Sequence, residues 1–331
     1  MSRQALPQAQ LLQQAMQALQ AQDFAAAADA FELALPTVDA PLRGGVLRSL
    51  VLLRSRLGEH AKALAHAETA LALDGTDAAL QDQRLAAMAR CGRADEALQL
   101  AGTVPLPNAA FRQADCLLLL HRPGEALAHF EAALAQQPDR PEILTGAAEA
   151  AYRCGRLDLA RTWLDRAVAL DPGNRSAVMA RATILLSLEP DNTARHQGLL
   201  DYEARLWPED SLRIERQLDL PRWEGEAMAG RHLLICAEQG IGDQIRFAAA
   251  LPALLNQGIR ITIECAERLV PLLARTWPQI AVQAAQEKRF GRRHVFFYDW
   301  LRDAAPGDRP HCYIEGGSLA LRLFEIDRLS A

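Results

Sequence analysis

The sequence predicts a protein in two parts, an α-helical solenoid followed by a smaller α/β lobe. Three observations support this prediction. The first half repeats its own pattern at intervals of 34 residues, and the second half alternates short β-rich runs with helical ones from His232 onward. The chain is also 331 residues long, which is about the length that two domains need.

The repeat is clearest where Gln113–Arg140 is laid over Ala147–Asn174. The matching pairs are Ala126 with Ala160, Ala133 with Ala167, and Pro138 with Pro172. Earlier segments carry apolar residues at the same places, namely Ala63, Ala67 and Ala70, and before them Ala27, Phe31 and Ala34. Small residues at these positions let two helices approach, and a proline ends the second helix. We therefore expect helix pairs whose alanines are buried where the paired helices touch.

This pattern resembles the tetratricopeptide repeat, with about five units between residues 8 and 174. A single helix pair cannot bury its apolar stripe alone, so roughly three or more pairs must stack, and stacking forms a superhelix with a concave groove. One unit is cut short before Pro107. Residues 175–219 are expected to form capping helices and a linker.

By resemblance, the first helix of each unit faces the groove. The residues at the groove-facing positions are Arg48, Arg56, Asp82, Arg90, Asn108, Phe111, Asp115, Glu142, Glu149, Tyr152 and Arg153. Two interpretations stay open. These are solvated helix positions, with Phe111 and Tyr152 packing between repeats, or they line a peptide groove in which the two aromatic side chains are anchors. The expected partner is therefore a protein or peptide.

The second half favours parallel strands joined by right-handed crossovers, a Rossmann-like sheet within residues 220–331. The predicted strands are HLLICA, IRITIEC and IAVQAA, with HVFFYDW and CYIEGG as further candidates. Ligands of such sheets bind at the carboxyl ends of the strands. The loop after the first predicted strand is therefore the leading candidate site, and it holds Glu238, Gln239, Gly240, Gly242 and Asp243.

This loop allows two interpretations. Gly240 and Gly242 can adopt positive φ or let a ligand approach the backbone, and a helix from about Gln244 offers N–H groups to a phosphate. In the other interpretation the loop is an ordinary turn, in which Asp243 caps the helix that follows.

The stretch Leu220–Pro278 resembles the start of the glycosyltransferase family 9 region, related to heptosyltransferases, that follows tetratricopeptide repeats in many bacterial proteins. The resemblance is carried by W-x-G-x-x-x-x-G-R at Trp223–Arg231 and by EQGIGDQIRF after it. It implies a two-lobed GT-B architecture. It also makes Asp243 the candidate catalytic base, which would deprotonate an acceptor hydroxyl.

Residues 220–331 suffice for about one such lobe, so the second lobe, which binds the nucleotide sugar in that family, is expected to be absent. An incomplete lobe favours an interaction scaffold over an enzyme. The alternative is a glycosyltransferase subunit that binds a nucleotide sugar once another chain supplies the donor lobe.

Composition argues against several other classes. A net charge of −5 leaves no basic face in either half, so nucleic acid is not an expected partner. The six cysteines form no CxxC pair and the histidines form no HExxH motif, so neither a metal nor a cofactor is predicted. No apolar run reaches roughly 18 residues and the start lacks the pattern of a secretory signal, so we expect a cytoplasmic protein without a membrane span.

Overall fold

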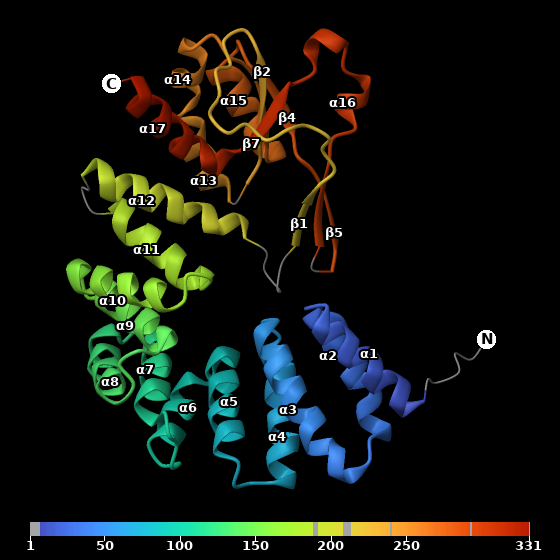
Figure 1. The fold of residues 1–331 in the computed structure, drawn as a ribbon, viewed down its shortest axis with the longest axis vertical. Coiled ribbons are helices and arrows are strands. Elements are labelled where there is room, and N and C mark those ends of the chain that lie inside the picture. Colours follow the sequence, from blue (N-terminus) through green and yellow to red (C-terminus); the bar gives the residue numbers. More distant parts are fainter. Residues whose placement is uncertain (1–6, 188–190, 208–212, 239, 292, 331) are drawn as a thin grey trace. The chain divides into compact units, whose positions relative to one another are not determined.

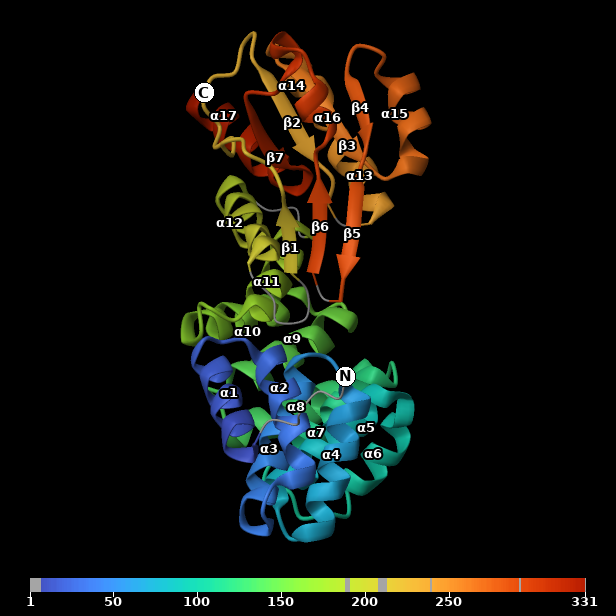
Figure 2. The same cartoon turned by 90° about the vertical axis from the view of Figure 1, so that its right-hand side faces the viewer.

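The structure is a computed structural model that describes residues 7–187, 191–207, 213–238, 240–291 and 293–330. The contacts within it divide the chain into two units, the first ending at Ile184 and the second beginning at Leu185. Figures 1 and 2 show the first unit as stacked helices and the second as helices packed around β-strands. The predicted fold class, a helical solenoid followed by a smaller α/β region, is therefore confirmed.

The first unit is built from consecutive helix pairs. Its α-helices are α1 (Gln8–Gln20), α2 (Phe24–Ala34), α3 (Ala40–Arg56), α4 (His60–Leu73), α5 (Ala78–Met88), α6 (Ala94–Ala101), α7 (Ala109–Leu119), α8 (Pro123–Gln136), α9 (Pro141–Arg153), α10 (Leu157–Leu170) and α11 (Arg175–Ser187). The short stretches η1 (Leu35–Thr37) and η2 (Ala89–Arg93) complete it. Helix α11 continues from the stack across the boundary between the units. Helix α6 is the shortened second helix that the sequence predicts before Pro107.

Alanine determines how closely these helices pair. Ala126, Ala133, Ala160 and Ala167 are all buried, with at most 4% of any of them exposed, which confirms the expected register. Each methyl group lets the backbone of the partner helix come close, and the larger apolar residues fill the space on either side. The turn after α9 passes through Gly155, whose φ of +74° lies in the left-handed region that glycine adopts without strain.

The second unit contains two sheets and the helices around them. Its helices are α12 (Asn192–Tyr202), η3 (Glu203–Leu206), α13 (Ile241–Ala248), α14 (Leu251–Asn256), η4 (Glu267–Leu269), α15 (Val270–Thr276), α16 (Trp300–Asp303), η5 (Pro306–Asp308), η6 (Gly316–Ser318) and α17 (Leu319–Ser330). Its strands are β1 (Arg213–Arg216), β2 (His232–Cys236), β3 (Arg260–Cys265), β4 (Ala281–Ala284), β5 (Gln286–Phe290), β6 (Arg293–Phe297) and β7 (Cys312–Glu315).

The larger sheet has four parallel strands in the order β4-β3-β2-β7. In its register Ile235 lies between Ile263 on β3 and Ile314 on β7. These three side chains belong to one buried core, to which helices α13, α14, α15 and α17 also contribute. Because the strands are parallel, all four carboxyl ends meet at one edge of the sheet, as the sequence predicts.

The smaller sheet, in the order β1-β6-β5, differs from the prediction. Only the first part of the run HVFFYDW, residues 294–297, is strand: it belongs to β6, which is parallel to β1 and antiparallel to β5 and is not part of the larger sheet. Neither β1 nor β5 is predicted from the sequence. Both are charged, with sequences RIER and QEKRF, and every residue of β5 is exposed. They therefore lack the apolar pattern by which a strand is recognised.

Part of the family 9 resemblance has a structural explanation. Trp223 is fully buried in the core of the larger sheet, and its indole N–H donates to the carbonyl oxygen of Glu226 at 2.9 Å. Gly225 and Gly230 have φ values of +102° and +73°, which side chains rarely permit. The spacing W-x-G-x-x-x-x-G therefore fixes a loop around a buried indole ring.

We expect Ala160→Leu to lower the free energy of unfolding by about 1–3 kcal/mol, because three extra carbon atoms must enter a closed helix contact. Chemical denaturation of the full chain measures this change. Ala169→Leu is the matched control, since Ala169 is exposed on the same helix α10. Equal stability of the two variants would show that the repeat register is wrong.

Gly146 provides a second test of packing between α8 and α9. A Cβ atom there would lie 2.6 Å from two ring carbons of Phe130, whose side chain is buried. Gly146→Ala should therefore destabilise the protein by about 1–3 kcal/mol. Gly124→Ala, on the open surface of α8, should instead stabilise it by about 0.4–1 kcal/mol. Thermal unfolding of both variants checks the sign, and a stabilised Gly146→Ala would contradict the packing described.

Candidate functional site

The first unit has a hollow of about 530 Å³ lined mainly by the first helices of successive repeats. Its lining includes Asp82, Arg90, Phe111, Arg112, Asp115, Phe130, Arg140, Glu142, Gly146 and Glu149. These residues come from α5, α7 and α9, together with Arg90 from η2, Phe130 from α8 and Arg140 just before α9. Stacking of the repeats thus brings charged and aromatic side chains from successive units into one surface.

The lining of the hollow contains an ion network around Arg112. This buried guanidinium donates to both oxygens of Asp82 at 3.0 and 2.8 Å and to Asp115 at 2.9 Å. Arg90 also donates to Asp115, at 2.9 Å. Burial works to lower the pKa of Arg112, but hydrogen bonds and charge from Asp82 and Asp115 raise it overall. The positive charges of two arginines are therefore balanced by the negative charges of two aspartates.

Aromatic rings lie beside this network. The ring centres of Phe111 and Phe130 are 6.1 Å apart, with their planes inclined by 56°. The guanidinium carbons of Arg112 and Arg140 each lie 5.4 Å from the centre of the Phe111 ring, within the range of a cation–π interaction. Phe111 is half-buried and lines the hollow. It thus offers apolar surface between charged groups.

The structure brings together some of the predicted groove residues and separates others. Arg90, Phe111, Asp115 and Glu149 all line the hollow, and Asp82 and Glu142 line it as well. The lining drawn from the described residues omits Asn108, Tyr152 and Arg153. Arg112, the most buried member of the ion network, is absent from the sequence-based set. Its spacing of three residues from Asp115 on a predicted helix is the signal that could have identified it.

The residues outside the hollow have other contacts. Asn108 accepts a hydrogen bond from the Gln137 side chain at 2.8 Å. Arg153 donates to Glu149 at 2.6 Å and to the Leu118 carbonyl oxygen at 3.3 Å. Tyr152 is 40% exposed. The two aromatic residues proposed as anchors therefore do not share one pocket.

In the second unit, the candidate loop follows β2 at the carboxyl edge of the larger sheet. Helix α13 begins at Ile241, three residues earlier than predicted, and Gly240 is the residue that precedes it. The expectation that Asp243 caps this helix is wrong, because Asp243 lies in its first turn and no side chain caps it. Neither Gly240 nor Gly242 has positive φ, and Gln239 lies outside the described residues.

The Asp243 carboxylate is 38% exposed and accepts a hydrogen bond from Arg246 at 3.2 Å. A Cβ atom on Gly242 would meet no atom within 4 Å, and one on Gly240 would meet only the Asp243 carboxylate at 3.8 Å. Internal packing therefore does not explain either glycine. Gly240 and Gly242 are exposed, while Ile241 between them packs against the core of the larger sheet.

Glu238, at the start of the same loop, is in a very different environment. Its side chain is buried and accepts hydrogen bonds from Arg205 of η3 at 3.1 Å and from the backbone N–H of Gly317 at 2.9 Å. Arg205 also donates to Ser318 at 2.6 Å and to Glu203 at 2.6 Å. Burial opposes ionisation of Glu203, but the nearby arginines and Ser318 lower its pKa overall. The carboxylate of Glu238 thus already has partners within the chain.

This cluster extends along the end of β7. Arg222 donates to Glu203 at 2.9 Å and to Glu315, the last residue of β7, at 2.8 Å. Ser318 donates to Glu203 at 2.8 Å. Glu203 and Ser318 come from segments more than 100 residues apart, so spacing in the sequence gives no signal for them.

A second buried cluster links the two sheets. Arg216 of β1 donates to the Tyr298 hydroxyl at 2.7 Å and to Glu264 of β3 at 3.3 Å. Glu264 also accepts from the backbone N–H of Ala237 at 2.9 Å. Burial raises the pKa of Glu264, although the charge of Arg216 opposes that shift. The start of the candidate loop is therefore fixed from both sides.

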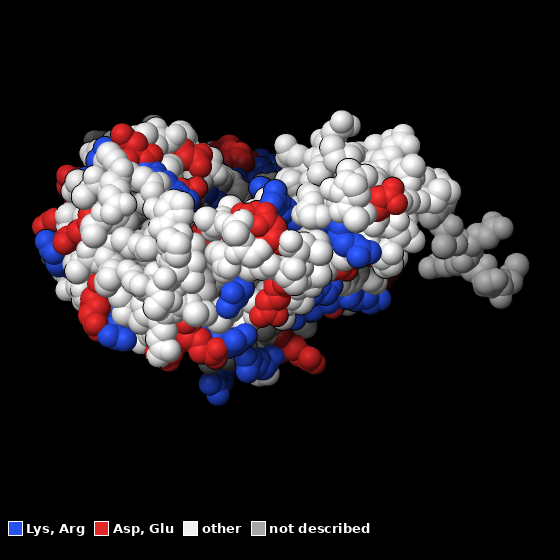
Figure 3. All heavy atoms as spheres, turned by 90° about the horizontal axis from the view of Figure 1, so that it is seen from below, with Lys and Arg blue, Asp and Glu red and all other residues white. Residues whose placement is uncertain are grey.

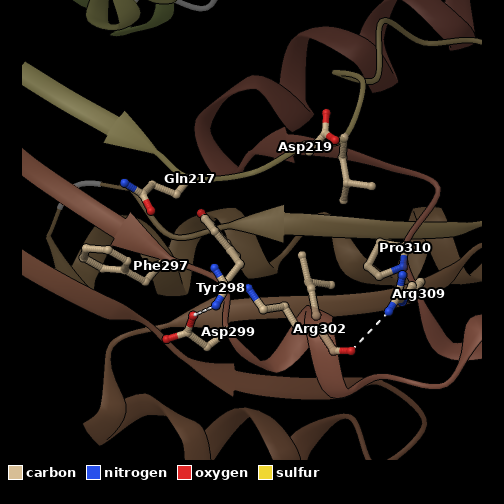
Figure 4. Close-up of a pocket in the computed structure, with 10 residues that line it drawn as sticks. Gln217, Asp219, Phe297, Tyr298, Asp299, Arg302, Arg309 and Pro310 are labelled. Carbon is tan, nitrogen blue, oxygen red and sulfur yellow. Dashed lines mark hydrogen bonds and ion pairs between the residues drawn. The ribbon is translucent and has the colours of Figure 1, made fainter.

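Beside this cluster lies a hollow of about 470 Å³ that the sequence does not predict (Figure 4). It lies where the chain leaves β1 and β6, and its lining includes Gln217, Asp219, Phe297, Tyr298, Asp299, Arg302 and Arg309. Arg309 donates to the carbonyl oxygens of Ala304 and Arg302 at 3.2 and 3.1 Å. The hollow depends on β1, so it could not be located without the tertiary structure.

Acidic and basic side chains are interspersed where they occur on the face drawn in Figure 3. Among the residues described, no three histidine, cysteine or acidic side chains are grouped so as to hold a metal ion. The helices in the described ranges are also too short or too polar to cross a membrane.

Comparison with known proteins agrees with the repeat assignment. A family model for the tetratricopeptide repeat matches residues 117–184. The chain is 31% identical to Protein FlbA of Caulobacter vibrioides over 300 residues, which are 85% of this chain and 48% of FlbA. The chain therefore spans about half the length of that relative.

Two solved structures are also similar. PilW, described as a widely conserved type IV pilus biogenesis factor, has 19% identity and a TM-score of 0.46, over 63% of this chain and 98% of PilW. A thermophilic tetratricopeptide repeat protein of Thermus thermophilus has 23% identity and a TM-score of 0.44, over 54% of this chain and all of that one. The comparisons give no support for a glycosyltransferase family 9 region. The chain therefore contains a region similar to tetratricopeptide repeats, and it is similar in sequence to about half of Protein FlbA.

Proposed function

We propose that this protein is an interaction scaffold that binds a segment of another protein in the hollow of its repeats. The observation that carries the proposal is the convergence of α5, α7 and α9 on one polar hollow with the half-buried Phe111 in its wall. Grooves of this kind bind extended or helical peptides through a few aromatic anchors and a polar rim.

The charges of the hollow indicate which kind of segment it binds. Each arginine of the lining already hydrogen-bonds to a side chain of this protein: Arg90 to Asp115, Arg112 to Asp82, and Arg140 to Gln137 at 3.1 Å. A terminal carboxylate would have to compete for these donors. An internal segment that places an apolar side chain against Phe111 avoids that competition.

The six cysteines suggest where the scaffold works. All six are free thiols, and Cys91 and Cys154 are exposed. Exposed thiols persist in a reducing compartment. We therefore propose a cytoplasmic location.

Phe111→Ala should weaken peptide binding by about tenfold or more, since aromatic anchors commonly contribute upwards of ~1.4 kcal/mol. Peptides are first selected on the wild-type chain from a phage-displayed random library. Their dissociation constants for wild type and variant are then compared by fluorescence anisotropy, with thermal unfolding as a check on folding.

Tyr152→Ala is the matched control, because Tyr152 is an aromatic residue of α9 outside the hollow. Its affinity for the selected peptides should remain close to that of the wild type. If both substitutions weakened binding equally, or neither did, the hollow would not be the peptide site.

Sugar transfer is a second candidate, favoured by the exposed Asp243 carboxylate at the carboxyl edge of a parallel sheet. A working site would bind a nucleotide sugar, and Asp243→Asn would abolish transfer while preserving the fold. We expect no micromolar affinity for UDP-, GDP- or ADP-sugars by calorimetry, because the Arg205 guanidinium beside this loop already donates to Glu238. Micromolar binding of any of them would instead favour transfer over the scaffold.

A further inference from the structure

The hollow in Figure 4 lies at the carboxyl ends of the two parallel strands of the smaller sheet. Strands β1 and β6 run in the same direction, so both end at one edge. Gln217 follows β1, Tyr298 and Asp299 follow β6, and all three line the hollow. Such an edge is the usual place for a ligand of a parallel sheet. The lining found among the described residues includes neither the loop after β2 nor any residue of the repeats.

The apolar part of the lining is fixed by packing. Tyr298 is buried in a small core on β2, and Leu220 and Leu301 pack against that core. Pro310 is buried as well. The hydroxyl group of Tyr298 is already bonded to Arg216 at 2.7 Å. Sites for small molecules usually measure ~300–1,000 Å³, so a hollow of about 470 Å³ has room for a small molecule with an apolar part.

Arg309 places a positive charge at the hollow in a fixed orientation. Its Nε and Nη2 atoms donate to the carbonyl oxygens of Ala304 and Arg302 at 3.2 and 3.1 Å, and Figure 4 marks the second of these bonds. Carbonyl oxygens carry no net charge, and among the residues that the structure describes no carboxylate pairs with Arg309. A guanidinium group that is already oriented and has no counter-charge is suited to bind a carboxylate.

Asp219 provides a negative charge at the same hollow. It is exposed, and in Figure 4 it lies across the view from Arg302 and Arg309. Within the described ranges no donor bonds to its carboxylate. The two other charged residues of the lining, Arg302 and Asp299, form an ion pair with each other at 3.4 Å. The hollow therefore has one positive and one negative charge that are not matched by the protein itself.

We propose that this hollow binds a free α-amino acid with an apolar side chain. Such a molecule carries a carboxylate for Arg309, an ammonium group for Asp219, and an apolar side chain for the surface of Leu220, Leu301 and Pro310. A singly charged anion leaves Asp219 without a partner, and a singly charged cation leaves Arg309 without one. Only a zwitterion complements both charges. This proposal does not depend on peptide binding in the hollow of the repeats.

Isothermal titration calorimetry of the full-length chain with L-phenylalanine, L-leucine and L-methionine tests the site. At least one of them should bind with saturation at millimolar concentration or below. Two analogues of the tightest binder are then compared with it, one without the amino group and one without the carboxyl group. For phenylalanine these are 3-phenylpropionate and 2-phenylethylamine. Each analogue should bind at least about tenfold more weakly. No saturable binding of the three amino acids, or equal binding of either analogue, would overturn the proposal.

Substitutions then assign the two charges. Asp219→Asn should weaken binding of the amino acid at least about tenfold and remove its advantage over the analogue without the amino group, because an amide carries no charge to attract the ammonium group. Arg309→Gln should weaken the amino acid and that same analogue alike. The matched controls are Asp327→Asn in α17 and Arg275→Gln in α15, which change exposed residues outside the hollow. Both controls should bind as the wild type does.

Thermal unfolding without ligand checks that each variant folds. The Asp219 side chain is exposed and has no bond within the described part of the chain, so Asp219→Asn should keep the Tm of the wild type. Arg309→Gln should lower the Tm, because it removes the bonds to the carbonyl oxygens of Ala304 and Arg302. The decisive variant is therefore Asp219→Asn. If it bound the amino acid as well as Asp327→Asn does, the proposed site would be wrong.

Discussion

An arginine that is buried when the protein folds needs carboxylates as partners, and this constraint shapes both units of the protein. Arg54 is almost fully buried and donates to Asp29, Glu32 and Glu59. Arg112 organises the hollow of the repeats in the same way, and Arg205 organises the edge of the larger sheet. Removing one partner of such a buried pair typically costs about 3–5 kcal/mol. These networks therefore specify which helices and loops meet, beyond what apolar burial requires.

Alanine contacts and arginine networks have different roles within the repeats. The alanines fix the distance between paired helices, because a methyl group allows close approach and a longer side chain does not. The buried arginines connect one helix pair with the next, as Arg112 of α7 does with Asp82 of α5. The same stacking that closes the core leaves the aromatic wall with Phe111 accessible. Stability and the proposed binding surface thus have a common origin.

The candidate loop after β2 combines two environments within a short segment. The Glu238 side chain is buried against Arg205, while Asp243 is exposed and contacts Arg246. The sequence analysis places both in one candidate ligand site, because the loop that holds them follows the first predicted strand. The structure places the two carboxylates in different environments. A buried carboxylate needs a cation of the same protein beside it, and for Glu238 this cation is Arg205 of η3. The loop is therefore anchored at its start and open toward its end.

The sequence by itself determined the repeat register, the parallel strands β2, β3 and β4, and the place of the loop at their carboxyl edge, because these depend on local periodicity and on the direction of parallel strands. It offered the run that forms β7 only as a further candidate strand. It did not determine β1 and β5, whose charged residues carry no apolar pattern. Only the tertiary structure decided that Tyr152 lies apart from the hollow and that Arg205 reaches Glu238. Contacts between side chains distant in the sequence depend on how the elements pack, and no spacing along the chain records that.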